Sequence, residues 1–255
     1  MTKKTDQPDN AAEASPNAIQ AVERAAMILS AFTVRKPWLS LNELTAHLGT
    51  SKPTAHRYTK ALRAVDLLRY DEAKALYSLG PQILALSSAA RAGLPIITAA
   101  GPFMDRLMRE INETVVLSIW DGSDSVVVVR AEDNTDRTTR VSIRAGTRLP
   151  LFTSAQGRIF CAYVDNDENP ILVKRMGRVP GLREELRRVR SSGFSVNSPD
   201  GHGTRTIAAP VFADGEVVAT IAVVGTAESI SAAPESPMVR ALLQTTADLA
   251  SGLGS

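Results

Sequence analysis

The sequence is poor in cysteine and has no long apolar run. Its single cysteine, Cys161, cannot form a disulfide within the chain or supply a multi-cysteine metal site. The longest apolar stretches, VVVV (126–129) and VVATIAVV (217–224), are much shorter than the roughly 20 residues that span a membrane. The opening MTKKTDQPDN has no apolar run behind its lysines, unlike a secretory signal. These absences predict a soluble, cytoplasmic protein with no membrane partner.

Histidine is also scarce, which restricts metal binding and catalysis. Only His202 lies outside the basic N-terminal part, which contains His47 and His56. A zinc site needs about four ligands, usually histidine or cysteine, and His202 with Cys161 cannot build one without several carboxylates. Cys161 itself lies in the apolar stretch IFCAYV, which predicts a buried thiol and not a nucleophile. We therefore predict no metal site and no cofactor.

Catalytic motifs are missing as well. The sequence has no Gly-x-Ser-x-Gly elbow and no Gly-x-x-x-x-Gly-Lys phosphate loop. A Ser-His-Asp triad is arithmetically possible, yet Gly-His-Gly around His202 is more typical of a turn with an exposed imidazole. We predict that the chain is not an enzyme and has no catalytic residue. The alternative is a small-molecule hydrolase that uses His202 in a C-terminal pocket.

The positive charge is concentrated near the N-terminus. The formal net charge is +2, but residues 17–80 contain nine Lys/Arg and five Asp/Glu, whereas residues 81–255 contain 18 and 19. A charge difference of this kind between two parts of a chain is typical of a nucleic-acid-binding segment. The polar, aperiodic residues 1–16 predict a disordered tail ahead of it.

Residues 17–80 predict three helices followed by a hairpin. The first helix is indicated by an apolar stripe of Ile19, Val22, Ala26, Leu29 and Phe32. Ser40-Leu-Asn-Glu43 is a capping box for a second helix, and Gly49 ends that helix. A third helix begins near Ser51, and LRY with ALYSL around Asp-Glu-Ala-Lys forms the hairpin. This order is typical of a winged helix-turn-helix domain.

The third helix, within SKPTAHRYTKALRAVDLL (51–68), has a basic face and an apolar face. At about 100° per residue, the basic side chains of Lys52, His56, Lys60 and Arg63 fall within an arc of about 80°. The opposite side carries Ala55, Tyr58, Leu62 and Val65. No acid appears before Asp66 to neutralise the basic face. We expect this helix to enter the major groove of DNA.

Individual roles follow from side-chain chemistry. Arg57 is the favoured base reader, because a guanidinium can hold guanine through two hydrogen bonds. Thr54 and His56 are weaker candidates for base contacts, and the lysines with Arg63 are expected to bind phosphates. The complete predicted DNA-binding set is Ser40, Ser51, Lys52, Thr54, His56, Arg57, Lys60 and Arg63. The alternative interpretation is a solvated basic face on a structural helix.

The rest of the chain predicts a connecting segment and a mixed domain. Residues 81–95 contain a connecting helix over 81–92, and residues 96–255 alternate strand and helix patterns. The expected strands are TVVLSIW (114–120), SVVVVR (125–130), RVSI (140–143), TIAAPVF (206–212) and VVATIAVV (217–224). The expected helices cover 96–112, 154–164, 181–190 and 237–249. Asp214-Gly215, between the last two of these strands, predicts a hairpin. Strands and hairpins mixed with helices predict an α+β fold.

Several of these segments resemble the IclR-type bacterial transcription regulators. The similar motifs are AVERAAMILSAF, LSLNELTAHLGTSKPTAHRYTKAL, NETVVLSIWDG, RAGTRLPLFTSAQGR, RRVRSSGFSVN and GTRTIAAPVFADGEVVATIAVVG. The resemblance covers nearly all of the chain from residue 17 onward. It implies a winged helix-turn-helix domain joined by a helix to a GAF-like α+β ligand-binding domain. It also implies homodimers or homotetramers that bind palindromic double-stranded DNA operators and respond to a small-molecule effector.

The resemblance further implies an effector site in the C-terminal domain. Carried over by motif, its residues are Ser154, Ala155, Gln156, Asn197, Thr206, Ala222 and Val224. Family members that bind small carboxylates often have serines on the final strand, where this chain has Ala222 and Val224. The acidic run usual after Gly-Phe-x-Val is replaced by NSPDGHG. Two interpretations stay open: a larger, apolar or aromatic effector, or residues that belong to the core.

The resemblance and the residues together predict a DNA-binding regulator that senses a metabolite. A purely architectural DNA-binding protein is a further alternative, and it would respond to no metabolite. The sequence identifies neither the effector nor the operator, and it does not separate a repressor from an activator.

Overall fold

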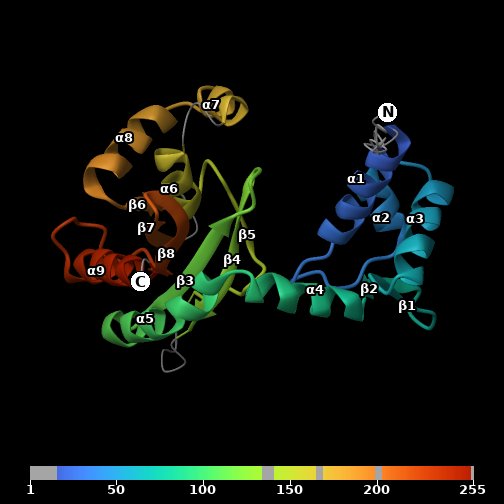
Figure 1. The fold of residues 1–255 in the computed structure, drawn as a ribbon, viewed down its shortest axis with the longest axis horizontal. Helices are drawn as coiled ribbons and strands as arrows, with labels where there is room; N and C mark the ends of the chain where they lie inside the picture. Colours follow the sequence, from blue (N-terminus) through green and yellow to red (C-terminus); the bar gives the residue numbers. More distant parts are fainter. Residues whose placement is uncertain (1–15, 134–140, 165–168, 199–202, 254–255) are drawn as a thin grey trace, which may run out of the picture. The chain divides into compact units, whose positions relative to one another are not determined.

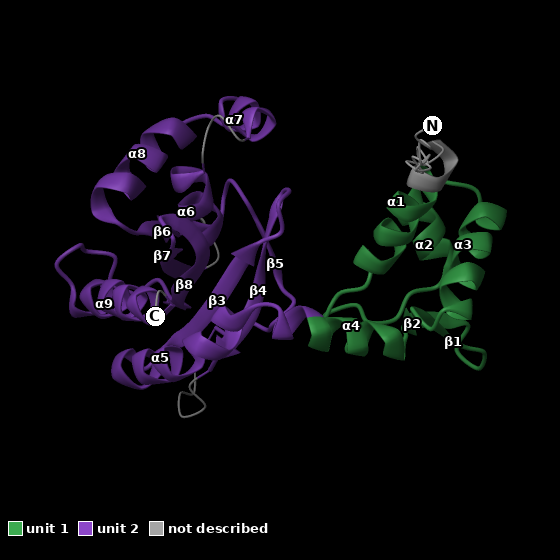
Figure 2. Cartoon of the chain, in the orientation of Figure 1, with its two compact units in different colours: residues 1–89 green, residues 90–255 purple. Residues whose placement is uncertain are grey.

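A computed structural model describes residues 16–133, 141–164, 169–198 and 203–253. The chain divides into two compact units, Met1–Ala89 and Ala90–Ser255 (Figures 1 and 2). The division falls within helix α4 (Pro81–Ala92), at the position where the sequence predicts a connecting helix. The tail predicted over 1–16 lies outside the described residues except for Pro16, which begins the first helix, and His202 lies outside them too.

No single helix in the described ranges is long and apolar enough to cross a membrane. Helices α4 and α5 (Pro95–Ile111) reach the required length and composition only when taken together, as a bent pair.

Unit 1 contains the three helices and the hairpin that the sequence predicts. Its elements are α1 (Pro16–Ser30), α2 (Leu41–Leu48), α3 (Lys52–Ala64), β1 (Leu68–Asp71) and β2 (Leu76–Leu79), followed by most of α4. The capping box of α2 is present, since Ser40 Oγ accepts a hydrogen bond from Glu43 N and Ser40 N donates one to Glu43 Oε2. Gly49 ends α2 with a φ of 59°, in the left-handed region that glycine adopts without strain. The order and caps confirm a winged helix-turn-helix arrangement.

The core of unit 1 corrects two sequence predictions. Val22, expected in the core, is 71% exposed, and Ile28 is fully buried instead. Apolar residues occur on both sides of α1, so their spacing alone does not select the packed side. Val65 is also exposed, because it follows Ala64, the last residue of α3, and the buried residues of this helix include Thr59 in addition to Ala55 and Leu62. The Thr59 hydroxyl donates to the carbonyl of His56, which satisfies it in the core.

Unit 2 is built on one antiparallel six-stranded sheet of order β5-β4-β3-β8-β7-β6. The strands are β3 (Thr114–Trp120), β4 (Ser125–Glu132), β5 (Arg148–Pro150), β6 (Ser195–Asn197), β7 (Thr204–Ala213) and β8 (Glu216–Thr226). The strand predicted over RVSI is wrong for its described residues, 141–143, which are irregular. The edge position is occupied by β5, a three-residue strand paired with the start of β4. The hairpin predicted at Asp214-Gly215 is confirmed between β7 and β8.

Helices cover both faces of this sheet (Figure 1). Helices α5 and α9 (Pro237–Leu253) pack on the face that carries Val115, Leu117 and Ile221. Helices α6 (Ala155–Tyr163) and α8 (Leu182–Ser192) pack on the opposite face, and α7 (Pro170–Met176) adds Leu172 to the same cluster. The apolar side of α5 faces this core, and Met104 is among its fully buried residues. The result is the predicted α+β class, with two apolar cores separated by the sheet.

Candidate DNA-binding and effector sites

Helix α3 presents one buried face and one basic face, as its sequence predicts. Ala55, Thr59 and Leu62 are its buried residues. The exposed side chains include Lys52, His56, Arg57, Lys60 and Arg63. None of these five forms an ion pair with a carboxylate of the described residues. The charge of the four Lys/Arg side chains among them is therefore available to an anionic partner, which an ordinary surface helix with mixed signs would not provide.

Two arginines of α3 lie against aromatic rings. The guanidinium carbon of Arg57 is 5.6 Å from the ring centroid of Tyr58, and that of Arg63 is 5.2 Å from the centroid of Tyr70. A contact of this kind holds a guanidinium in place without neutralising it. The aromatic rings thus restrict two positively charged side chains and leave their hydrogen-bond donors free.

The first turn of α3 lacks a side-chain cap. Ser51 occupies the N-cap position, but its hydroxyl makes no capping bond and lies 2.9 Å from the hydroxyl of Thr54. The amide groups at the start of a helix carry partial positive charge and attract phosphate. Ser40 is also predicted to contact DNA. Unlike the hydroxyl of Ser51, its hydroxyl takes part in a helix cap, where it exchanges two hydrogen bonds with Glu43.

In unit 2 the predicted effector residues fall at the start of α6 and on three strands of the sheet, β6, β7 and β8. Ser154 is the N-cap of α6, where its hydroxyl accepts from Gly157 N at 3.0 Å and donates to the carbonyl of Pro150 at 2.7 Å. Ala155 and Gln156, in the first turn of α6, are both buried. The Ser154 hydroxyl therefore has a structural role at the start of this helix.

Strand register places the other predicted residues on the sheet face that α6 covers. Asn197 of β6 lies opposite Thr206 of β7, which lies opposite Val224 of β8. Directly opposed residues of antiparallel strands point to the same face. Ala222 lies two positions from Val224 on the same strand and so points to the same face. Both residues, together with Ala155, are part of the apolar cluster under α6. The structure thus brings the predicted residues to one side of the sheet, where Ala222 and Val224 also serve the core.

Three buried hydroxyls on this same face were not predicted from the sequence. Ser118, Ser195 and Thr220 have buried side-chain oxygens without a hydrogen-bond partner in the described parts of the chain. Ser118 lies opposite Thr220, and Ser195 lies opposite Ala208 of the cluster under α6. An unpaired buried hydroxyl is costly, so groups of this kind commonly serve a ligand or water. The two-residue alternation of the strands could have placed these side chains on the inner face of the sheet, but it could not show that they lack partners.

Cys161 is buried in α6, as predicted. Burial raises the pKa of its thiol to about 12, because the charged thiolate would lose its hydration. The thiol is therefore not a nucleophile at neutral pH. Near the far end of α6 a cavity of 430 Å³ is lined in part by Trp120, Phe160 and Tyr163, and none of the predicted effector residues borders it.

The described residues contain no group of three or more His, Cys, Asp or Glu side chains placed to hold a metal ion. The geometry instead defines a class of protein: a winged helix-turn-helix unit with an unneutralised basic helix, followed by an α+β unit whose sheet carries buried polar groups. This class is that of DNA-binding transcription regulators with a second, ligand-binding domain.

Comparison with known families agrees with this class. Residues 21–72 match the IclR helix-turn-helix domain, and residues 88–251 match the model described as bacterial transcriptional regulator IclR C-terminal. The chain therefore belongs to the IclR family of transcriptional regulators, which are not enzymes. Residues 21–72 therefore form the DNA-binding domain, and residues 88–251 form the ligand-binding domain.

Curated relatives are similar over most of their length. The HTH-type transcriptional repressor AllR of Salmonella typhi is 26% identical over 259 residues, which covers 97% of this chain and 94% of AllR. The HTH-type transcriptional regulator Rv1719 of Mycobacterium tuberculosis is 31% identical over 188 residues, 70% of this chain and 71% of that protein.

Solved structures share the fold. A putative IclR regulator from Silicibacter sp. aligns with a TM-score of 0.78 at 22% identity, covering 92% of this chain and 96% of that one. An IclR homolog from Microbacterium hydrocarbonoxydans, complexed with 4-hydroxybenzoate, aligns with a TM-score of 0.72 at 21% identity and covers 91% and 98%.

Proposed function

We propose that this regulator binds a palindromic DNA operator through α3. Arg57 is the base reader in this proposal, and Lys52, Lys60 and Arg63 bind phosphates. The observation that carries it is the basic face of α3, none of whose cations pairs with a carboxylate of the described residues. The uncapped first turn, with Ser51 and Thr54 bonded to each other, adds a second anion-attracting feature.

A palindrome requires two recognition helices related by two-fold symmetry, so we propose that the protein acts as a homodimer or a homotetramer. Exposed apolar side chains support self-association. Helix α4 has no buried residue and exposes Leu84 and Leu86, while α1 exposes Val22 and Met27. Two half-sites about one helical turn apart, or a multiple of it, follow from this symmetry.

We further propose that the effector is a small apolar or aromatic metabolite bound between α6 and the sheet. Ala155, Ala222 and Val224 give that side of the sheet its apolar character. The unpaired hydroxyls of Ser118 and Thr220 offer hydrogen bonds to a polar substituent of the ligand. The Microbacterium homolog, crystallised with 4-hydroxybenzoate, carries a ligand of this chemical class. The effector regulates by binding the DNA-competent and incompetent forms with unequal affinity.

The DNA-binding proposal is tested by fluorescence anisotropy with a labelled duplex from upstream of the protein's own gene. The expected result is specific binding whose affinity falls steeply with salt, and a Lys52→Ala/Lys60→Ala double variant that binds more weakly at every salt concentration. An Arg188→Ala variant serves as the control, because this exposed arginine lies on α8 of unit 2. Equal binding by the double variant and the control would contradict a role for α3.

The effector proposal is tested by thermal shift with a panel of aromatic and aliphatic carboxylates. A stabilising ligand should lose its effect in a Ser118→Ala/Thr220→Val variant, which removes both buried hydroxyls at nearly constant volume. A stabilisation that survives this change would place the ligand elsewhere. Turnover of any ligand, lost on His202→Ala, would instead support the hydrolase alternative.

A further inference from the structure

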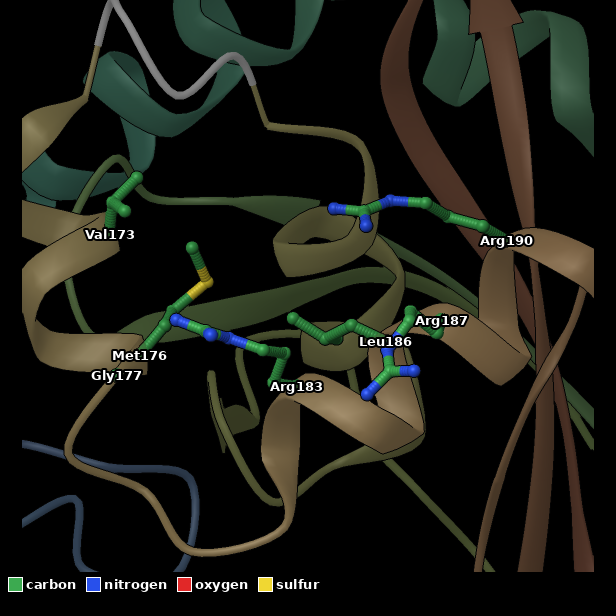
Figure 3. Close-up of a pocket in the computed structure, with 7 residues that line it drawn as sticks. All are labelled: Val173, Met176, Gly177, Arg183, Leu186, Arg187 and Arg190. Atoms are coloured by element: carbon green, nitrogen blue, oxygen red, sulfur yellow. The ribbon is translucent and has the colours of Figure 1, made fainter.

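Unit 2 contains a second cavity, which two of its helices form. It has a volume of 380 Å³ and lies between α7 and α8 (Figure 3). Val173 and Met176 of α7 and Leu186 of α8 form its apolar part, and Arg183, Arg187 and Arg190 of α8 provide its polar part. None of the residues predicted to bind DNA or effector lines it.

The cavity lies in a strongly basic segment of an otherwise acidic part of the chain. Residues 170–190 contain seven Lys/Arg and two Glu, while the remainder of residues 81–255 contains 11 Lys/Arg and 17 Asp/Glu. Surface charge keeps a protein soluble, but solubility does not require positive charges to be concentrated around one cavity. This distribution favours an anionic occupant.

The three arginines differ in how they are held. Arg183 is exposed and forms no ion pair or hydrogen bond with another described residue. Arg187 pairs with Glu184 at 2.7 Å, but both side chains are largely exposed, so the pair contributes little. Arg190 donates from Nε to the carbonyl of Ala162, which fixes the guanidinium and leaves its terminal nitrogens for a ligand.

The close-up shows how these groups meet the apolar wall. In Figure 3 the side chains of Arg183 and Arg190 extend from α8 toward α7, where Met176 and Val173 lie. A guanidinium binds a carboxylate, sulfonate or phosphate through two parallel hydrogen bonds, which an ammonium cannot match. The apolar side chains between the arginines would contact a hydrocarbon or aromatic body of the same molecule.

We propose that the cavity between α7 and α8 binds a small amphipathic organic anion, distinct from the effector. Its anionic group is held by Arg183 and Arg190, and its apolar body lies against Val173, Met176 and Leu186. The volume lies within the range of about 300–1,000 Å³ that is usual for small-molecule sites. This proposal does not depend on the effector site, because the two share no residue.

The test uses the full-length protein and a fluorescent organic anion, 1-anilinonaphthalene-8-sulfonate. Fluorescence titration should give saturable binding to the wild type. Arg183→Ala should weaken that binding by roughly fivefold, the upper range for the loss of one solvent-exposed charge contact, and Arg183→Glu should weaken it further. Because Arg183 is exposed and has no partner among the described residues, circular dichroism and the melting temperature should not change.

Two matched controls separate a built site from general surface charge. Arg188→Ala removes the same charge from the same helix but does not line the cavity, so it should leave the affinity unchanged. N-phenyl-1-naphthylamine lacks the sulfonate, and its binding should be insensitive to Arg183→Ala. Equal losses in the Arg183 and Arg188 variants, no loss in the Arg183 variants, or no saturable binding by the wild type would each overturn the proposal.

Discussion

The ammonium nitrogen of Lys36 lies 2.7 Å from Oε1 of Glu43. The other carboxylate oxygen, Oε2, accepts hydrogen bonds from both the amide and the hydroxyl of Ser40, each at 2.8 Å. One carboxylate therefore closes the first turn of α2 and holds the segment that precedes it. Since α2 is the first helix of the helix-turn-helix, this carboxylate supports the element against which α3 packs.

This arrangement predicts a pH dependence of stability. The hydrogen bond from Lys36, followed by those from Ser40, lowers the pKa of Glu43 from 4.5 to about 2. A lowered pKa in the folded protein means that the stabilisation is complete above about pH 4.5 and is lost as the pH falls toward 2. The melting temperatures of wild type and Glu43→Gln should therefore differ most above pH 5 and converge near pH 2. In the control, Glu72→Gln in the exposed turn between β1 and β2, the difference from wild type should be small at every pH. A constant difference for Glu43→Gln would contradict the proposed linkage.

Arg57→Ala should weaken operator binding by roughly 1–3 kcal/mol and relax base preference at the position that the guanidinium contacts. The measurement is competition binding with operators altered one base pair at a time. An unchanged affinity for the intact operator would reject a role in base reading.

Lys60→Ala should act differently, because a phosphate contact carries no sequence information. Binding should weaken about equally for operator and random DNA, and the slope of log affinity against log salt should decrease by about 1. A loss confined to the operator would contradict a backbone role for Lys60.

Gly157→Ala should destabilise unit 2. A Cβ atom at this position in α6 would lie 2.1 Å from the carbonyl oxygen of Leu151, which is backbone and cannot move cheaply. Overpacking of this kind typically costs about 1–3 kcal/mol, measurable by urea unfolding. Gly252→Ala is the control, because beyond its neighbours and its own helical turns no described atom lies within 4 Å of its Cβ position in α9, and a helical alanine gains up to about 1 kcal/mol. Equal stability of the two variants would show that the backbone around Leu151 shifts to make room for the added methyl group.

Cys161 should be inert in the folded protein. With its pKa raised to about 12 by burial, it should not react with Ellman's reagent at pH 8, and one thiol per chain should react after unfolding in guanidinium. Rapid reaction of the native protein would mean that α6 opens readily.

Features set by neighbouring residues were predictable from the sequence. The Ser40–Glu43 capping box, the Gly49 helix end and the Asp214-Gly215 hairpin depend on contacts within a few positions, and all three are confirmed. The basic face of α3 follows from helical periodicity alone. These local signals were sufficient for the winged helix-turn-helix and the α+β class.

Features set by tertiary packing were not predictable. The choice between Val22 and Ile28 depends on which side of α1 meets the rest of the unit. The three residues of β5 form a strand only because β4 pairs with them, whereas RVSI has a β-rich composition and no strand partner over 141–143. The buried hydroxyl of Ser118 became notable only once its lack of a partner was visible.

The centre of the six-stranded sheet joins distant parts of the chain, since β3 pairs with β8 from Thr114 opposite Val224 to Ser118 opposite Thr220. During synthesis, β3 leaves the ribosome long before β8. The backbone groups along one edge of this apolar strand therefore stay unpaired until almost the whole of unit 2 has emerged. Unit 1 has no such dependence, because its strands pair within a dozen positions. The nascent chain should therefore acquire a folded DNA-binding head well before it acquires a sensing domain, and truncation ahead of β8 should leave an aggregation-prone edge.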